Sequence, residues 1–160
     1  MSTYRNDQVK MTTEVESLRN MLSYVEHLQS YDAKMLTVPI KSGKWSIREI
    51  IGHLYYWDSY LMESVIPRLA QDASLPPFPY PAVYNRAAIA SLEGRKVSRI
   101  LEGFITSRKL LIEQIMSLDD QMTFKIRGSE ETFTTNKLVD MFSKHDMHHQ
   151  EQMESFLTQA

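Results

Sequence analysis

The sequence contains no cysteine among its 160 residues. This absence excludes disulfide bonds, thiolate metal ligands and a cysteine nucleophile, so any thiol used in a reaction has to come from outside the chain. The chain also lacks 18 consecutive apolar residues, and residues 1–20 contain no apolar run with a small-residue cleavage site. We therefore expect a cytoplasmic protein that does not interact with a membrane.

The sequence also has no large excess of basic or of acidic residues. The 18 basic and 20 acidic residues give a formal net charge of -2. Because proteins hold a phosphate backbone through a broad positive field, this balance argues against a nucleic-acid partner. The length of the chain, with no repeat or low-complexity tract, predicts one domain over residues 1–160.

Apolar residues recur at three- and four-residue steps through most of the chain, which is the period of an amphipathic helix. Ser46 and Glu49 have the spacing of a capping box, and Asn85 is a suitable helix cap. The pattern predicts an all-α fold, a four-helix bundle. Its helices are predicted over residues 5–31, 46–70, 85–116 and 134–157.

Two of the connections between these helices have a distinctive composition or pattern. The loop 74–85 contains four prolines, so it is stiff and extended and could cover a site. Its Phe78, together with Trp57 and Tyr60, forms either an apolar pocket or ordinary core. Residues 122–133 alternate between apolar and polar side chains, which predicts a short hairpin or an irregular excursion before the last helix.

Three of the five histidines lie within residues 145–149. On a helix, His145 and His149 are about 40° apart on one face and could bind one metal ion. Their face is otherwise apolar. His53, in the second predicted helix, also has apolar and aromatic neighbours and is the candidate third ligand. A divalent ion would accept a lone pair from each neutral imidazole and so compensate for burying them.

Three histidine ligands leave a coordination position open for water or substrate, as in catalytic metal sites. Imidazole ligation suits zinc, nickel, copper or iron, and zinc and nickel are the ions we expect first. Gln152 lies one turn beyond His149 and could orient the bound water or a ligand histidine.

Each of these residues also has a purely structural interpretation. A histidine pair four residues apart is often a surface or structural feature, and a lone histidine such as His53 often satisfies its hydrogen bonds within a core. His148 could replace one of the pair, whereas His27 is expected at the surface or between helices. Asp146 is rotated by about 100° from His145, and we expect it to face solvent.

Two segments, residues 45–54 and residues 145–152, resemble the DinB/YfiT-like superfamily. Trp45 precedes the helix start, a glycine precedes His53, and the histidine pair is followed by Gln152. The likeness extends over nearly the whole chain. It implies a four-helix bundle of unusual connectivity.

The resemblance implies that His53, His145 and His149 hold a divalent metal ion. One departure follows the last of these ligands: relatives often carry arginine and glycine there, whereas this chain has Gln150 and Glu151. The change leaves the ligands intact but puts in doubt any substrate or partner contact that an arginine would make.

The function implied by the resemblance is that of a metal-dependent transferase. Such an enzyme would join a low-molecular-weight thiol, such as bacillithiol, mycothiol or glutathione, to a small electrophile. The same site could serve a hydrolase in which a metal-activated water is the nucleophile. A non-catalytic metal- or small-ligand-binding module of the stress response is a third alternative, and a DNA-repair role rests on the family name alone. The family also implies a homodimer. No catalytic base is assigned.

Overall fold

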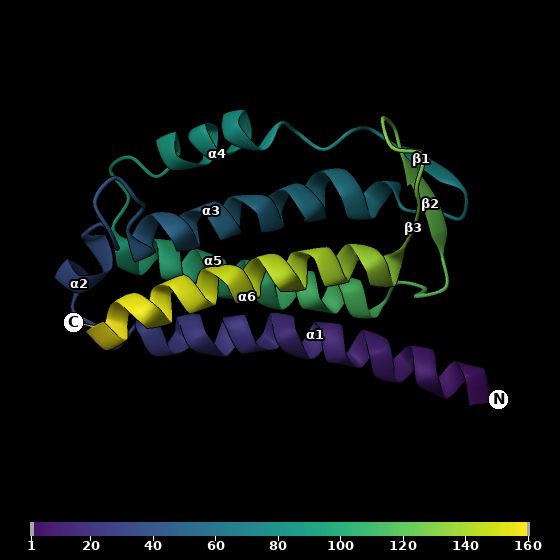
Figure 1. The fold of residues 1–160 in the computed structure, drawn as a ribbon, viewed down its shortest axis with the longest axis horizontal. Coiled ribbons are helices and arrows are strands. Elements are labelled where there is room, and N and C mark those ends of the chain that lie inside the picture. Colours follow the sequence, from purple (N-terminus) through teal and green to yellow (C-terminus); the bar gives the residue numbers. More distant parts are fainter. Residues whose placement is uncertain (1, 160) are drawn as a thin grey trace.

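Four long helices run side by side along the molecule (Figure 1). The computed structural model describes the backbone of residues 2–159 and the side chains of residues 13–159. The fold confirms the predicted four-helix bundle, although the two ends of the predicted domain, residues 1 and 160, lie outside the described part. No helix within residues 2–159 combines the length and the apolarity needed to cross a membrane. The four helices are α1 (Ser2–Leu28), α3 (Ile47–Tyr60), α5 (Val97–Met116) and α6 (Thr135–Gln159).

The first turn of α3 contains the predicted capping box. The Ser46 hydroxyl accepts from the backbone N–H of Glu49 at 3.2 Å, and the Glu49 carboxylate accepts from the backbone N–H of Ser46 at 3.1 Å. Both N–H groups would otherwise lack a partner at the helix start. At the other end, α3 continues into a π-helical turn (η1, Leu61–Val65) and a 3₁₀ turn (η2, Ile66–Arg68) that contains Pro67.

The helix predicted over residues 85–116 is wrong in one respect, because the structure divides this region into two helices. The first is α4 (Pro81–Ala90), which begins at a proline whose missing N–H would have no helical partner. The chain then turns before α5, at a point where Gly94 has a φ of 77°. Asn85 consequently lies inside α4 and is not its cap.

Helix α4 covers the side of α3 that faces away from α1 (Figure 1). This packing requires glycine at position 52 of α3. A Cβ atom there would lie 2.3 Å from Cδ1 of Leu92, whose side chain is 1% exposed. The loop after α4 therefore sits directly against the α3 backbone, one residue before His53.

Alanine in place of Gly52 is expected to destabilise the protein by about 1–3 kcal/mol, because the new methyl group overlaps Leu92 in a filled core. Gly103 of α5 provides a matched control, since the atom nearest to a Cβ there would belong to Tyr55, at an ordinary contact distance of 3.5 Å. Gly103→Ala is expected to raise the stability by up to about 1 kcal/mol through helix propensity. Urea unfolding of both variants measures the difference, and equal changes in stability would contradict the steric argument.

A small three-stranded sheet closes one end of the bundle (Figure 1). Strands β2 (Thr123–Ile126) and β3 (Thr132–Thr134) form an antiparallel hairpin, which confirms the predicted one. The proline loop adds β1 (Ala73–Leu75), parallel to β2, where only a loop was expected. A strand of three residues carries too short a pattern to be predicted, and its hydrogen-bond partners lie about 50 residues away in the sequence.

A buried ion-pair network joins three of the long helices. Arg108 of α5 is 1% exposed, and its guanidinium donates to Asp58 of α3 at 2.7 Å and to Asp146 of α6 at 2.6 Å. The expectation that Asp146 faces solvent is therefore wrong, since this residue is only 3% exposed. His145 faces α3, and a rotation of about 100° from it turns Asp146 toward Arg108 instead of toward solvent.

The sequence did contain a signal for this network. Buried residues of α5 recur at three- and four-residue steps through Leu101, Phe104, Leu111 and Ile115, and Arg108 occupies a position of that same series. A charge at a core position requires a buried partner of opposite sign. Which acidic residues serve as partners depends on the packing of α3 and α6.

Candidate metal centre

The structure brings together the three histidines that the sequence analysis singled out. His53 projects from α3, and His145 and His149 project from successive turns of α6. Nε2 of His145 lies 3.3 Å from Nε2 of His53 and 3.1 Å from Nε2 of His149. One ring nitrogen from each residue lies within 4.8 Å of the other two. We call these three side chains the imidazole cluster.

Burial keeps the imidazole cluster neutral at physiological pH. Burial, followed by the neighbouring His145 and His149, lowers the pKa of His53 to about 3. Burial is also the main cause that lowers the pKa of His145 to about 4, and it lowers the pKa of His149. A neutral imidazole keeps one nitrogen lone pair, which is the form that binds a metal ion.

Hydrogen bonds and packing around the cluster orient the rings. Nδ1 of His149 donates to the side-chain oxygen of Gln152 at 2.9 Å, so the lone pair of this ring is on Nε2, which faces the cluster. The ring of Trp45 packs against the ring of His53, with centroids 4.9 Å apart. Gln152 thus orients the ring of His149, as its position one turn further along the helix predicted.

The donor set fits a divalent transition metal. Nδ1 of His53 is buried with no hydrogen-bond partner among the described residues, and the Nε2 atoms of His53 and His149 both lie close to Nε2 of His145. Lone pairs that face one another repel, whereas one cation would accept all of them. The arrangement is consistent with a divalent metal site, and the choice of zinc or nickel stays a prediction.

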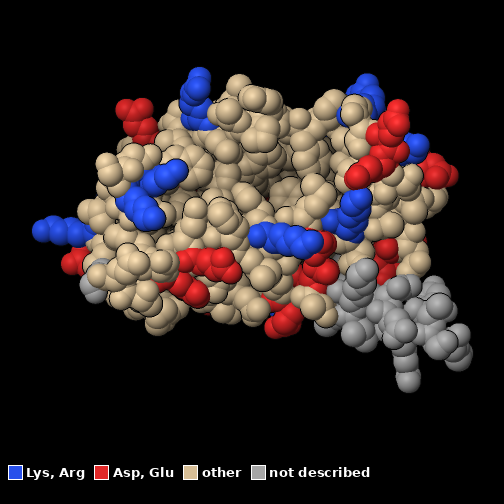
Figure 2. All heavy atoms as spheres, in the orientation of Figure 1, with Lys and Arg blue, Asp and Glu red and all other residues tan. Residues whose placement is uncertain are grey.

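Two cavities adjoin the imidazole cluster. We call the first the aromatic cavity; its volume is about 310 Å³, and Figure 2 shows it as a hollow between α4 and α6. The second, the loop cavity, has a volume of about 270 Å³. The aromatic cavity is lined by His53, Trp57, Phe78, Pro81, Asn85, Met141, Phe142 and His145. The loop cavity is lined by Ile40, Gly43, Lys44, Trp45, Ile50, His149 and Gln152.

The pocket expected from three aromatic residues is present in part. Trp57 and Phe78 line the aromatic cavity, whereas Tyr60 packs against both of them, with ring centroids 5.8 and 5.6 Å away. Asn85 was missed as a site residue because it was expected to cap a helix. Its side-chain oxygen accepts from the indole N–H of Trp57 at 2.8 Å.

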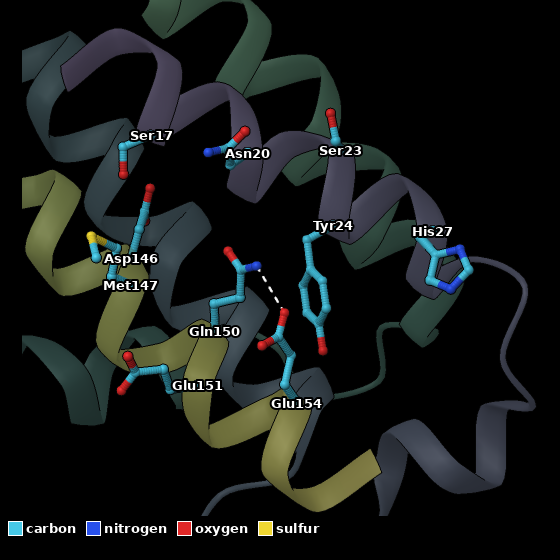
Figure 3. A pocket seen from close by; sticks show the side chains of 10 residues that line it. All are labelled: Ser17, Asn20, Ser23, Tyr24, His27, Asp146, Met147, Gln150, Glu151 and Glu154. Atoms are coloured by element: carbon cyan, nitrogen blue, oxygen red, sulfur yellow. Dashed lines mark hydrogen bonds between the residues drawn. The ribbon is translucent and has the colours of Figure 1, made fainter. Parts of the chain in front are cut away.

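The other two histidines lie outside the cluster. His148 is exposed, with its ring centroid 5.4 Å from that of His149. His27 is exposed on α1. It lines a groove between α1 and α6, of about 600 Å³, which contains no member of the imidazole cluster (Figure 3).

The departure from the family pattern also lies in the α1–α6 groove. Gln150 and Glu151 both line it, and Gln150 donates to Glu154 at 3.0 Å (Figure 3). Neither residue lines the aromatic cavity or the loop cavity. These two residues therefore lie on a surface of α6 that is separate from the two cavities beside the imidazole cluster.

Alanine in place of His53 is expected to make the metal-free protein less sensitive to acid. The pKa of His53 is about 3 in the folded chain, compared with 6.5 for a histidine in an unfolded chain. As the pH falls below 6.5, the unfolded chain binds a proton that the folded chain does not, so the free energy of unfolding decreases. For His53 alone this loss is about 2 kcal/mol at pH 5.

Urea unfolding of chelator-treated wild type and His53→Ala, at pH 7.5 and pH 5, measures this contribution. Burial raises the pKa of Asp58 to about 6, so protonation of Asp58 on acidification increases the free energy of unfolding. This contribution is present in both proteins and cancels when they are compared. The wild type should lose more stability than the variant between the two pH values. The same loss in both proteins would show that His53 is not buried in its neutral form.

Comparisons with known proteins agree with this description. The family model of the DinB superfamily matches residues 15–153. A search of curated proteins gave no match. Among solved structures, the chain is similar to YfiT from Bacillus subtilis, described as "a probable metal-dependent hydrolase with an unusual four-helix bundle topology". The TM-score is 0.67 at 16% sequence identity, over 93% of this chain and 86% of that one. The family match covers most of the sequence, and this chain therefore belongs to the DinB superfamily.

Proposed function

We propose that this protein is a divalent-metal-dependent enzyme that conjugates a low-molecular-weight thiol to a small electrophile. The observation that supports it best is the convergence of three neutral imidazoles, buried or half-buried, beside two cavities. A divalent ion held by His53, His145 and His149 would supply a Lewis acid that lowers the pKa of a thiol. We further propose that the protein is a homodimer, which light scattering tests.

The chain's own residues would hold and orient the reactants. Gln152 keeps the ring of His149 in one tautomer, and Trp57 and Phe78 provide apolar surface for an electrophile. In the proposed reaction the thiol loses its proton to solvent, its sulfur forms a bond to the electrophilic carbon, and the leaving group departs with the bonding pair. No side chain is required as a base, because the thiol ionises near neutral pH once its pKa is lowered.

A metal-dependent hydrolase is the second candidate, favoured by the description of YfiT. In that reaction a water molecule would replace the thiol and attack an ester, amide or phosphate. Carboxylates commonly take the proton from such a water. No Asp or Glu lines either of the two cavities in the described part of the chain. A bound metal ion would lower the pKa of this water as it would lower that of a thiol, so the requirement for a thiol in the assays below distinguishes the two candidates.

Elemental analysis of protein purified without an affinity tag, followed by two assays, tests the proposal. The first assay follows conjugation of glutathione or another low-molecular-weight thiol to 1-chloro-2,4-dinitrobenzene, and the second follows hydrolysis of p-nitrophenyl acetate without thiol. We expect thiol-dependent turnover that chelation abolishes. Turnover in the second assay alone would favour the hydrolase, and bound metal without turnover in either would favour a non-catalytic binding module.

A further inference from the structure

The imidazole cluster separates the aromatic cavity from the loop cavity. The two cavities share no lining residue. Along α6, Met141 and His145 line the aromatic cavity, whereas His149 and Gln152, one to two turns further on, line the loop cavity. Two molecules could therefore approach the cluster from different sides without competing for the same space.

The aromatic cavity has the chemistry of a site for an uncharged ring. Trp57, Phe78 and Phe142 present aromatic surface to it, and no Lys, Arg, Asp or Glu lines it. Asn85 is its one polar residue apart from histidine, and the Asn85 side-chain oxygen is already bonded to Trp57. Aromatic ligands bind such surfaces by stacking and apolar burial, and an anion would find no counter-charge there.

The loop cavity differs in charge. Lys44 gives it a positive side chain, Gln152 gives it an amide, and no carboxylate lines it. Gly43, with a φ of 75°, has no side chain to fill the space next to Lys44. A lysine acts as a point charge for an anionic group such as a carboxylate. The loop cavity therefore suits the polar, acidic partner of a pair of reactants.

We propose that the two cavities are separate subsites that are filled at the same time. The aromatic cavity takes the uncharged, ring-bearing electrophile, and the loop cavity takes a thiol that carries a carboxylate, with its sulfur directed to the imidazole cluster. This assignment rests on the proposed transferase function and adds to it which reactant lies on which side.

The two tryptophans of the chain allow each subsite to be observed separately. Trp57 lines the aromatic cavity and Trp45 lines the loop cavity, and the sequence has no other tryptophan. Trp45→Phe leaves only the first reporter, and Trp57→Phe leaves only the second. Nitrobenzene, an uncharged ring that quenches fluorescence, serves as the probe for the aromatic cavity, and mercaptosuccinate serves as the carboxylate-bearing thiol.

We expect the quenching of Trp57 fluorescence to saturate as nitrobenzene is added, because the probe binds next to this residue. The quenching of Trp45 fluorescence should increase only linearly with concentration, as collisions in solution do. Mercaptosuccinate should change the emission of Trp45 and leave that of Trp57 unaltered. Each probe should bind with unchanged affinity when the other is present at saturation. Competition between the two probes, or a saturable response of the same tryptophan to both, would overturn the proposal.

Matched variants test the residues of each subsite. Met141→Glu should weaken nitrobenzene binding roughly tenfold by placing a charge at the edge of an apolar cavity, whereas Met147→Glu, at a similarly exposed methionine of the same helix that lines the α1–α6 groove, should not. Lys44→Glu should weaken mercaptosuccinate binding, whereas Lys41→Glu, in the same loop but outside the cavity, should not. Equal effects within a pair would overturn the assignment of that subsite.

The binding measurements and the activity assays test the two proposals separately. Fluorescence responses that follow the two-subsite pattern, in a protein without conjugating activity, would reject the proposed transferase and retain the two subsites. Conjugating activity with no saturable binding of nitrobenzene near Trp57 would retain the transferase and reject the subsites. All titrations are made on the protein as purified and again after chelation, so that binding is measured with and without its metal.

Discussion

Alanine in place of His149 is expected to lower the affinity for a divalent metal ion by roughly 100-fold or more. Loss of an outer hydrogen-bond partner of a metal ligand alone typically lowers affinity 10–100-fold, and here the ligand itself is removed. The increase in melting temperature that added metal gives the wild type should disappear in the variant, because a ligand stabilises the fold only as far as it binds. His53→Ala should behave in the same way.

His148 provides the control, because it is the neighbouring histidine on the same helix and its ring lies outside the imidazole cluster. His148→Ala should keep the metal affinity and the metal-dependent melting temperature of the wild type. Titration of chelator-treated protein with zinc and with nickel, read by calorimetry and thermal unfolding, measures both variants. If His148→Ala loses metal and His149→Ala retains it, the third ligand is assigned to the wrong one of these two neighbouring histidines.

Methionine in place of Arg108 is expected to decrease the free energy of unfolding by about 3–5 kcal/mol. The guanidinium donates to Asp58 and to Asp146, which are 2% and 3% exposed, and it also donates to the backbone oxygen of Leu18 at 3.3 Å. Its removal leaves two carboxylates buried without a cationic partner. Such charges cannot be rehydrated without opening the core, so the variant loses far more than one hydrogen bond.

Arg99 of the same helix is the matched control. It pairs with Glu102 at 3.3 Å, but the Arg99 side chain is 75% exposed. Arg99→Met should therefore change the stability by less than about 1 kcal/mol. Urea unfolding at pH 7.5 compares the two variants. A second variant, Arg108→Met with Asp58→Asn and Asp146→Asn, should recover part of the lost stability, and no recovery would show that the loss comes from packing rather than from unpaired charge.

The Arg108 network also has a consequence for the candidate metal centre. Asp146 is adjacent to His145 in α6, and Asp58 lies five residues after His53 in α3. The ion pairs with Arg108 therefore hold α3 and α6 together close to the point where His53 meets His145. A less stable but folded Arg108→Met protein should bind metal more weakly than Arg99→Met, which the same metal titrations will measure.

Much of the fold and of the site could be predicted from local patterns. The capping box at Ser46, the four-residue spacing of His145 and His149, and the hairpin before α6 depend on residues close together in sequence. The division of the region 85–116 was missed because Leu92 and Val97 were taken as one apolar series, although the five-residue step between them across Gly94 breaks the helical period. Strand β1 was missed because three residues define no period of their own.

The sequence by itself determined most of the helical segments, the pair of histidines on one face of α6 and the presence of a third histidine in an apolar face of α3. These features follow from the helical period, which relates residues up to four positions apart. Only the tertiary structure decided that His53 meets that pair, that Asp146 is buried against Arg108, and that two cavities of different chemistry adjoin the cluster. The physical reason is that periodicity defines the apolar face of a helix but not the helix that packs against it.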